Sequence, residues 1–206
     1  MKTDETTENV EMTYKILMIG DYDTGKTCII KRCVPDSLQY IGEDFAIKSI
    51  YLNNGTRINL QLFDTCGQER FKCLTKNYYV KAVVAFIVFD VTRMSTFDSI
   101  TNWKTDIHNI CPSIPIILIA NKIDLIQSGC NWGRTQDEMD KFCEEFGFSG
   151  WIETSALANI GIDNVIQKLT YVISEKIYKP AQNKYNLYDS DVTNLNEQKT
   201  KLPCCY

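Results

Sequence analysis

The stretch that decides the fold of this chain reads Gly20-Asp21-Tyr22-Asp23-Thr24-Gly25-Lys26-Thr27. The apolar run at 15–19 before it predicts a short strand, and the run at 28–32 after it predicts the start of a helix. A glycine, four residues and then Gly-Lys-Thr, placed between a strand and a helix, is the pattern of a P-loop. We therefore predict that the chain binds the phosphates of a nucleotide here.

The predicted loop has a specific physical chemistry. Its backbone N–H groups converge on phosphate oxygens, and the dipole of the following helix adds to the attraction. We expect Lys26 to reach the β- and γ-phosphates and Thr27 to place its hydroxyl on Mg²⁺. The nucleotide contacts are predicted to extend from Gly20 through Cys28.

Composition and charge bound the class of protein. With 206 residues, 44% of them apolar, the chain can form one packed domain and a tail. A net charge of -4, without a basic run longer than Lys31-Arg32, argues against nucleic-acid binding. The sequence shows no signal peptide and no apolar span of about 18 residues, so we expect synthesis in the cytosol and no membrane crossing. Of the nine cysteines, all but Cys204 and Cys205 are scattered without metal-ligand spacing and are expected to be reduced and mostly packed.

Strand and helix patterns alternate along the rest of the chain. Alternating apolar residues on both sides of 53–56 predict a hairpin of half-exposed strands, whereas near-continuous apolar runs predict buried parallel strands. The predicted strands are 15–19, 45–52, 57–63, 82–89, 114–120 and 151–154, and the later predicted helices are 95–110, 135–146 and 162–178. The predicted fold class is α/β, a doubly wound, mostly parallel sheet with one antiparallel edge hairpin.

Polar residues follow the second hairpin strand, at an edge where ligands bind in this architecture. Asp64 can hold the Mg²⁺ shell through water, and the amide of Gly67 can meet the γ-phosphate. Gln68 can orient an attacking water and is the candidate catalytic residue.

Two further clusters predict the base. Asn121-Lys122-Ile123-Asp124 follows a buried strand, and its last carboxylate would accept two N–H donors of guanine. Adenine would be rejected, because buried polar groups left unpaired are costly. Ser155 and Ala156 follow the last strand and can present a backbone amide to the guanine oxygen.

In these motifs the chain resembles a Rab-type small GTPase of the Ras superfamily, over 14–178 and again at the C-terminus. The residues that carry the resemblance are Ile41-Gly42-Glu43-Asp44-Phe45, Asp64-Thr-Cys-Gly-Gln-Glu-Arg-Phe71, Tyr78-Tyr79 and Phe89-Asp-Val-Thr-Arg93. Within the Rabs, the runs 85–93 and 142–156 are similar to the branch associated with lysosome-related organelles and mitochondria. We divide the chain into a flexible extension at 1–13, a small G-domain at 14–179 and a hypervariable tail at 180–206.

The resemblance implies a switch in vesicle trafficking that binds GTP and hydrolyses it to GDP with Mg²⁺. It also implies four kinds of partner: an exchange factor, a GTPase-activating protein, a GDP-dissociation inhibitor or escort protein, and effectors that read the GTP form. The effector face implied for this chain comprises Ile41, Gly42, Phe45, Phe63 and Tyr78, with Phe63 where the family usually has Trp.

The C-terminus resembles the double-cysteine signals of Rabs. The four-residue prenylation signal would need a cysteine where Pro203 stands. Two geranylgeranyl groups, on Cys204 and Cys205, are expected, because one lipid chain binds only marginally and the tail has no basic patch to assist it. The expected location is the cytosolic face of an intracellular membrane, in exchange with the cytosol.

The chain departs from this family in its first switch. Tyr40 stands where the family has a threonine before Ile-Gly, and the loop between Thr27 and Ile41 is shorter. That threonine supplies a hydroxyl to Mg²⁺ and an amide to the γ-phosphate in the GTP state. We therefore hypothesise that the switch senses GTP weakly and that intrinsic hydrolysis is slow.

Further departures surround the predicted nucleotide. The ring of Tyr22 would block an arginine inserted by an activating protein. The carboxylate of Asp23 should repel phosphate unless it points away or pairs, so Asp23→Gly is expected to tighten GDP retention. Leu157 replaces the lysine that packs over the base in the family, while Lys122 can still cover the other face.

Two functions stay open at this point. One is a GTPase switch in which Gln68 positions the water, and the other is a nucleotide-binding scaffold with impaired hydrolysis that recruits partners at a membrane. The intact Lys26 favours the first, whereas Tyr22, Asp23 and Tyr40 favour the second. A P-loop kinase or ATPase is disfavoured by the Asn-Lys-x-Asp motif.

Overall fold

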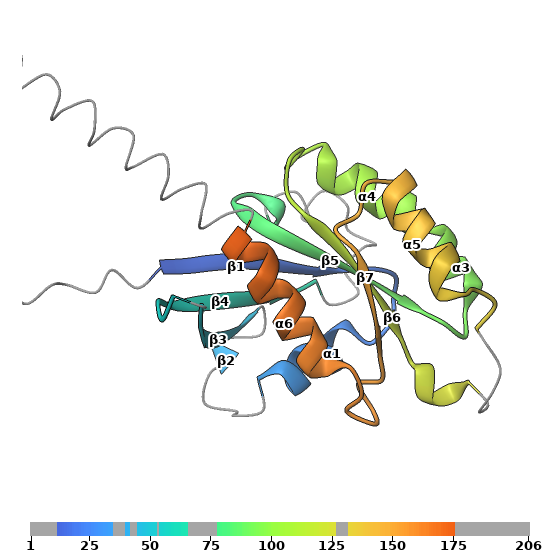
Figure 1. The fold of residues 1–206 in the computed structure, drawn as a ribbon, viewed down its shortest axis with the longest axis horizontal. Helices are drawn as coiled ribbons and strands as arrows, with labels where there is room; N and C mark the ends of the chain where they lie inside the picture. The colour runs from blue at the N-terminus through green and yellow to red at the C-terminus, as the bar shows by residue number, and fades with distance from the viewer. Residues whose placement is uncertain are drawn as a thin grey trace, which may run out of the picture.

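A single sheet organises the chain, and the P-loop leaves its central strand. The structure is a computed structural model that describes residues 12–34, 40–41, 45–52, 54–65, 78–126 and 132–175. Within these ranges seven strands lie in the order β2-β3-β4-β1-β5-β6-β7 (Figure 1). Strands β4, β1, β5, β6 and β7 run parallel, and β3 pairs antiparallel with both β2 and β4. The predicted fold class is therefore confirmed.

The elements have the following bounds. The strands are β1 (Met12–Ile19), β2 (Tyr40–Ile41), β3 (Phe45–Tyr51), β4 (Arg57–Asp64), β5 (Ala82–Asp90), β6 (Ile116–Asn121) and β7 (Trp151–Thr154). The helices are α1 (Lys26–Cys33), α3 (Met94–Asp98), α4 (Ile100–His108), α5 (Gln136–Glu145) and α6 (Ile162–Ile173), with a 3₁₀ turn at Ile123–Leu125.

The sheet separates two apolar cores, because successive side chains of a strand point to opposite faces. In β1, Ile16 and Met18 belong to the core beneath α1 and α6, whereas Leu17 and Ile19 belong to the core beneath α3, α4 and α5. Figure 1 shows these two groups of helices on opposite sides of the sheet. Each fully buried side chain of this size contributes roughly 1.5–3 kcal/mol, and strands covered on both faces therefore read as continuous apolar runs.

The start of one strand, the continuity of one helix and the presence of one short strand differ from the sequence-based expectation. Strand β1 begins at Met12, because Met12–Met18 pairs in register with β4, so two residues assigned to the flexible extension lie in the sheet. The helix predicted for 95–110 is two helices that meet at Ser99, whose hydroxyl donates to the carbonyl of Ser95 at 3.0 Å. Such local bonds compete with a regular helix. The strand β2 was not predicted, because two residues are too few to show the alternation of apolar and polar residues that indicates a strand.

The helix predicted for 135–146 agrees with α5, and the helix predicted for 162–178 is described as α6 over Ile162–Ile173, with 176–178 outside the described residues. Helix α5 begins with a capping box: the Glu138 N–H donates to Thr135 Oγ1 at 3.3 Å, and the Thr135 N–H donates to the Glu138 carboxylate at 2.7 Å. No helix in the described ranges has both the length and the apolar content that a bilayer span requires.

The cysteines of the described ranges are free of disulfides. Burial raises the pKa of Cys33 to about 12 and that of Cys143 to about 11, so neither thiol ionises near neutral pH. Cys28 is exposed in the first turn of α1, next to the P-loop.

Candidate nucleotide site

Two glycines let the P-loop pass against the ends of β5 and β6. Gly20 has φ 141°, and a Cβ on it would lie 2.1 Å from the carbonyl oxygen of Val88. Gly25 has φ 96°, and a Cβ there would lie 2.2 Å from Nδ2 of Asn121. A side chain at either position would collide with a neighbour that has no room to move. The first and last glycines of the motif are therefore needed for the close approach of backbone that forms a phosphate cradle.

The P-loop lysine lies inside its own loop. The side chain of Lys26 is only 5% exposed, and its ammonium donates to the carbonyl oxygens of Gly20 at 2.8 Å and Asp21 at 2.7 Å. Thr24 closes the turn by donating to the same Asp21 carbonyl at 3.0 Å. A buried cation at the N-terminus of α1 makes this loop a site for an anion.

The tip of the P-loop is held from outside at three consecutive residues. The indole N–H of Trp103, on α4, donates to Asp21 Oδ1 at 2.7 Å. The guanidinium of Arg93 donates to the carbonyl of Tyr22. Asp23 has φ 60° and pairs through its carboxylate with Lys122. The Tyr22 side chain itself is 70% exposed, so the loop presents its ring to solvent.

Lys122 lies between two carboxylates. Its ammonium is 2.9 Å from Asp90 Oδ2, which is buried, and 3.3 Å from Asp23 Oδ2, which is exposed. Burial opposes ionisation of Asp90, but hydrogen bonds from Thr92 and Lys122 outweigh it and hold the pKa of Asp90 below its usual value. Burial likewise lowers the pKa of Lys122, but the bonds to both carboxylates outweigh this and raise it. Asp23 therefore pairs with Lys122, one of the two conditions under which its carboxylate was expected not to repel phosphate.

Asn121 joins three parts of the site. Its Nδ2 donates to the carbonyl of Thr24 in the P-loop at 2.8 Å. Its Oδ1 accepts the hydroxyl of Thr154 at 3.0 Å and the backbone N–H of Ala156 at 3.2 Å. The Ala156 amide, predicted to face the guanine oxygen, thus donates to Asn121 in this structure. Because both amide ends of Asn121 are occupied, this residue positions the loops around it.

The carboxylate of Asp124, which is predicted to bind guanine, accepts a hydrogen bond from Ser155 of the Ser-Ala motif. The Ser155 hydroxyl donates to Asp124 Oδ1 at 2.5 Å and accepts the N–H of Ala158 at 2.9 Å. Leu157, which stands where a lysine was expected to cover the base, is 77% exposed. Its side chain therefore extends over the open side of the site.

These residues surround a cavity of about 370 Å³, which lies within the size range of small-molecule sites. It is lined by Asp23, Gly25, Cys28, Lys31, Arg32, Asn121, Lys122, Asp124, Leu125, Ala156 and Leu157. The fold thus brings the P-loop, the Asn-Lys-x-Asp motif and the Ser-Ala motif together around one space.

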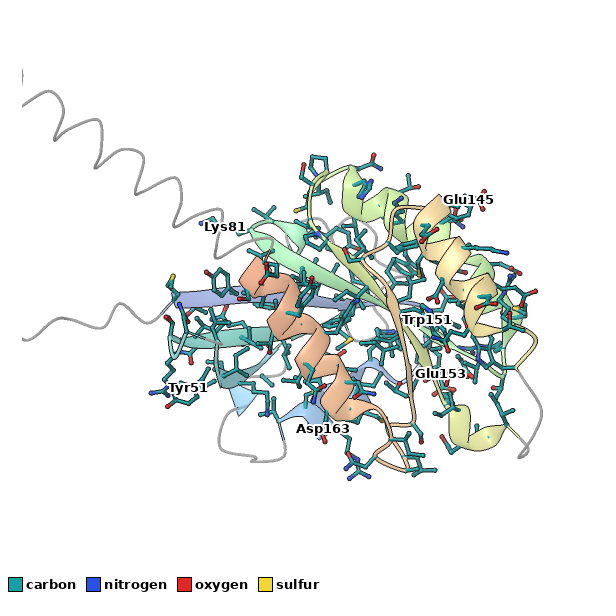
Figure 2. All side chains as sticks on the ribbon, viewed as in Figure 1. Tyr51, Lys81, Glu145, Trp151, Glu153 and Asp163 are labelled. Atoms are coloured by element: carbon teal, nitrogen blue, oxygen red, sulfur yellow. The ribbon has the colours of Figure 1, made fainter. Side chains whose placement is uncertain are left out.

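A larger hollow of about 630 Å³ lies along β7 and contains none of the predicted site residues. Figure 2 shows Trp151 and Glu153, which line it, on the edge strand. The chemistry therefore points to the smaller cavity.

Residues suited to Mg²⁺ lie beside the P-loop. Asp64 ends β4 opposite Met18, two residues before the loop begins, and is 6% exposed. Thr27 lies in the first turn of α1. Carboxylate and hydroxyl oxygens are the hard ligands that Mg²⁺ prefers, so this donor pair fits the ion. The described ranges contain no group of three His, Cys, Asp or Glu side chains that would hold a metal alone.

The implied effector face is assembled in part. Phe45 and Phe63 stack with ring centroids 4.9 Å apart, and the ammonium of Lys15 lies 4.3 Å from the Phe63 ring centre. Tyr78 packs against the same core cluster as Phe63. The backbone of Ile41 pairs with Phe45. The predicted site residues that lie outside the described ranges are Gly42, Gly67, Gln68, Cys204 and Cys205.

Sequence reasoning missed several residues that hold this site. Asp90 was detectable, because it too ends a buried parallel strand at the ligand edge. The bond of Trp103 to the P-loop joins residues 82 positions apart in the chain, which no local pattern predicts. The ring centroid of Trp132 lies 5.5 Å from that of Phe89 and 6.3 Å from that of Phe97.

Comparison with known proteins agrees with this geometry. The Ras family model matches residues 15–175. The chain is 40% identical to Ras-related protein Rab-32A of Dictyostelium discoideum in an alignment of 207 positions that covers 95% of this chain and 94% of the relative. It is 38% identical to Ras-related protein Rab-32 of Homo sapiens (96% and 92% covered) and 33% identical to Ras-related protein Rab-7L1 of Homo sapiens (93% and 97% covered). The chain therefore belongs to the Ras family, among its Rab-type small GTPases.

Proposed function

We propose that this chain is a membrane-attached Rab-type switch that binds GTP and GDP with Mg²⁺ and hydrolyses GTP slowly. Family membership gives the coarser statement, a GTP-binding switch in vesicle trafficking. The observation that carries the proposal is the convergence of Gly25, Asn121, Asp124 and Ala156 around one cavity beside the start of α1. The buried ammonium of Lys26 lies in the same P-loop.

Guanine selectivity follows from the held carboxylate. Ser155 fixes one oxygen of Asp124, and the carboxylate lines the cavity, where it would accept the two N–H donors of guanine. Adenine offers no such pair of donors, and a desolvated carboxylate left without them costs about 1–3 kcal/mol or more. The Rab-like base preference is thus supported by Asp124 and Ser155.

Phosphate and metal chemistry use the other end of the site. Thr27 and, through water, Asp64 would hold Mg²⁺, which neutralises charge on the phosphates. Lys26 supplies a second positive charge to the same oxygens, and Gln68 orients the attacking water. These residues are the ordinary set for GTP hydrolysis.

Slow turnover is proposed from the first switch and the P-loop tip. The backbone of Tyr40 pairs with Ala46 at the sheet edge, and a phenol hydroxyl stands much farther from its backbone than a threonine hydroxyl does. If the backbone N–H of Tyr40 reached the γ-phosphate, its phenol hydroxyl would lie too far away to bind Mg²⁺ as the threonine hydroxyl does. The exposed ring of Tyr22 would also obstruct an arginine from an activating protein.

Attachment and partners complete the proposal. We place a G-domain that begins with β1 at Met12 and extends to 179, followed by a tail at 180–206 that carries geranylgeranyl groups on Cys204 and Cys205. The protein would cycle between the cytosol and the cytosolic face of an intracellular membrane, in the manner of the lysosome-related Rab branch. Exchange, activating and GDP-dissociation-inhibitor or escort proteins would drive the cycle. Effectors would read the stacked Phe45–Phe63 face.

A second function deserves the same test, namely a scaffold that binds nucleotide but does not turn it over. Tyr40 and the Tyr22-Asp23 tip favour it, because they alter the two places where the family senses the γ-phosphate. The two functions predict the same binding and different hydrolysis.

The deciding experiment measures nucleotide binding and single-turnover hydrolysis on the full chain with Mg²⁺. GTP and GDP are expected to bind and ATP and ADP to fail, with Lys26→Ala as the non-binding control. Hydrolysis is expected to be slow, clearly faster than that of Gln68→Leu, and accelerated by Tyr40→Thr. Equal rates for the wild-type chain and Gln68→Leu would establish the scaffold instead, and binding of adenine nucleotides would overturn both functions.

A further inference from the structure

An arginine on α1 reaches across to the loop that follows β7. Nε of Arg32 donates to the carbonyl oxygen of Ala156 at 2.8 Å, and Nη2 donates to the carbonyl oxygen of Leu157 at 3.0 Å. The two partners lie more than 120 residues along the chain from Arg32. The guanidinium therefore ties the P-loop helix to the loop that carries the Ser-Ala motif.

Other bonds hold this loop at its ends, from the side of β6, and through the Ala158 N–H, which donates to Ser155 Oγ at 2.9 Å. Ser155 and Ile160 exchange both backbone hydrogen bonds, and the Ala156 N–H donates to Asn121. Between these points the side chain of Leu157 is largely exposed. The two bonds from Arg32 thus fix the outer part of the loop against α1.

Peptide geometry carries the effect of these bonds into the cavity. A peptide unit is planar and trans, so its carbonyl and the following N–H point in opposite directions. When Arg32 holds the Ala156 carbonyl, it also fixes the direction of the Leu157 N–H, and Leu157 and Arg32 both line the 370 Å³ cavity. A lysine cannot reproduce this arrangement, because it has a single nitrogen on a flexible stem, whereas the guanidinium places several donors in one rigid plane.

We propose that Arg32 is a positioning residue for guanine recognition: it orients the backbone N–H of Leu157 toward the 6-oxygen of the base. The proposal rests on the nucleotide site proposed above and adds a residue to it. Arg32 touches the loop and not the reacting phosphates, so its effect is on the choice and retention of the base.

The test measures how strongly each variant distinguishes GDP from two analogues. In 6-thio-GDP a weakly accepting sulfur replaces the 6-oxygen, and IDP lacks the 2-amino group that Asp124 would read. Arg32→Gln is expected to shrink the preference for GDP over 6-thio-GDP by about tenfold, the value of roughly one oriented hydrogen bond. The preference for GDP over IDP should stay unchanged, and Arg32→Lys should resemble Arg32→Gln.

The matched control is Arg57→Gln, which makes the same chemical change on β4, where the guanidinium donates to Ser49 at 3.2 Å. If Arg32→Gln fails to fold, Arg32→Lys supplies the comparison. A wild-type chain that prefers guanine, with Arg32 variants that keep both preferences or lose both equally, overturns this inference alone. A wild-type chain without guanine preference overturns the proposed function and this inference with it.

Discussion

Replacing Asp23 with asparagine tests how the altered P-loop tip affects nucleotide retention. The substitution keeps the volume and removes the charge, and asparagine accepts the left-handed backbone at φ 60°. Lys122 loses its exposed partner at 3.3 Å but keeps the buried Asp90 at 2.9 Å. The lysine should therefore stay near its present position.

The magnitude follows from two opposing contributions. An ion pair as exposed as Asp23–Lys122 contributes only about 0.2–1 kcal/mol to stability. Two unit charges about 4 Å apart near a protein surface interact by about 4 kcal/mol, and pairing, exposure and salt reduce the repulsion between Asp23 and the phosphates to roughly a quarter of that. We expect about 1 kcal/mol tighter GDP binding in Asp23→Asn, which is roughly a fivefold slower dissociation.

The assay is dissociation of a fluorescent GDP at low and at moderate salt. Asp98→Asn, an exposed carboxylate on α3, is the matched control and should leave the rate unchanged. The difference between Asp23→Asn and the wild-type chain should shrink as salt rises, because exposed charges are screened. Faster dissociation from Asp23→Asn would refute the repulsion argument and show that Asp23 supports binding by holding Lys122.

Three other substitutions test how the site is built. Asp90→Asn removes a buried carboxylate whose charged hydrogen bonds contribute about 1.5–3 kcal/mol, so the melting temperature should fall by roughly 4–8 °C. Because folding lowers the pKa of Asp90, its contribution to stability is present above about pH 4 and is lost as the pH falls through the lowered pKa. The melting temperatures of Asp90→Asn and the wild-type chain should therefore converge in acid. Gly20→Ala places a Cβ 2.1 Å from the Val88 carbonyl and should abolish soluble, folded protein in an expression and circular-dichroism test. Trp103→Phe keeps the ring but loses the bond to Asp21, so GDP dissociation should accelerate by roughly 3–10-fold with little change in melting temperature.

Two of these changes, Gly20→Ala and Trp103→Phe, have a matched control elsewhere in the chain. Gly55→Ala has a similar backbone strain at φ 82° but an added Cβ meets nothing within 4 Å, so it should fold. Trp151→Phe loses an equivalent bond, 2.8 Å to Asp140, away from the P-loop, and should leave GDP release unchanged. Equal melting curves for Asp90→Asn and the wild-type chain at neutral pH, or equal GDP release from both tryptophan variants, would contradict the roles assigned here.

The sequence by itself determined the sheet class, the order of elements and the four loops that carry the ligand motifs. These features are local, because apolar period, turn residues and capping patterns lie within a few residues of one another. The Gly-Lys-Thr, Asn-Lys-x-Asp and Ser-Ala motifs were found in this way, and parallel strands place their carboxyl ends at one edge.

Only the tertiary structure decided how those loops hold one another. The contacts that hold the loops join segments far apart in the chain, so no local sequence pattern predicts them. They are Trp103 with Asp21, Arg32 with Ala156, and Lys122 with its two carboxylates. The same holds for the charge of Asp23, whose effect depends on a partner that the sequence could not place. Residue types specify which bonds are possible, and the packing of α1, α4 and β6 around the P-loop selects the ones that form.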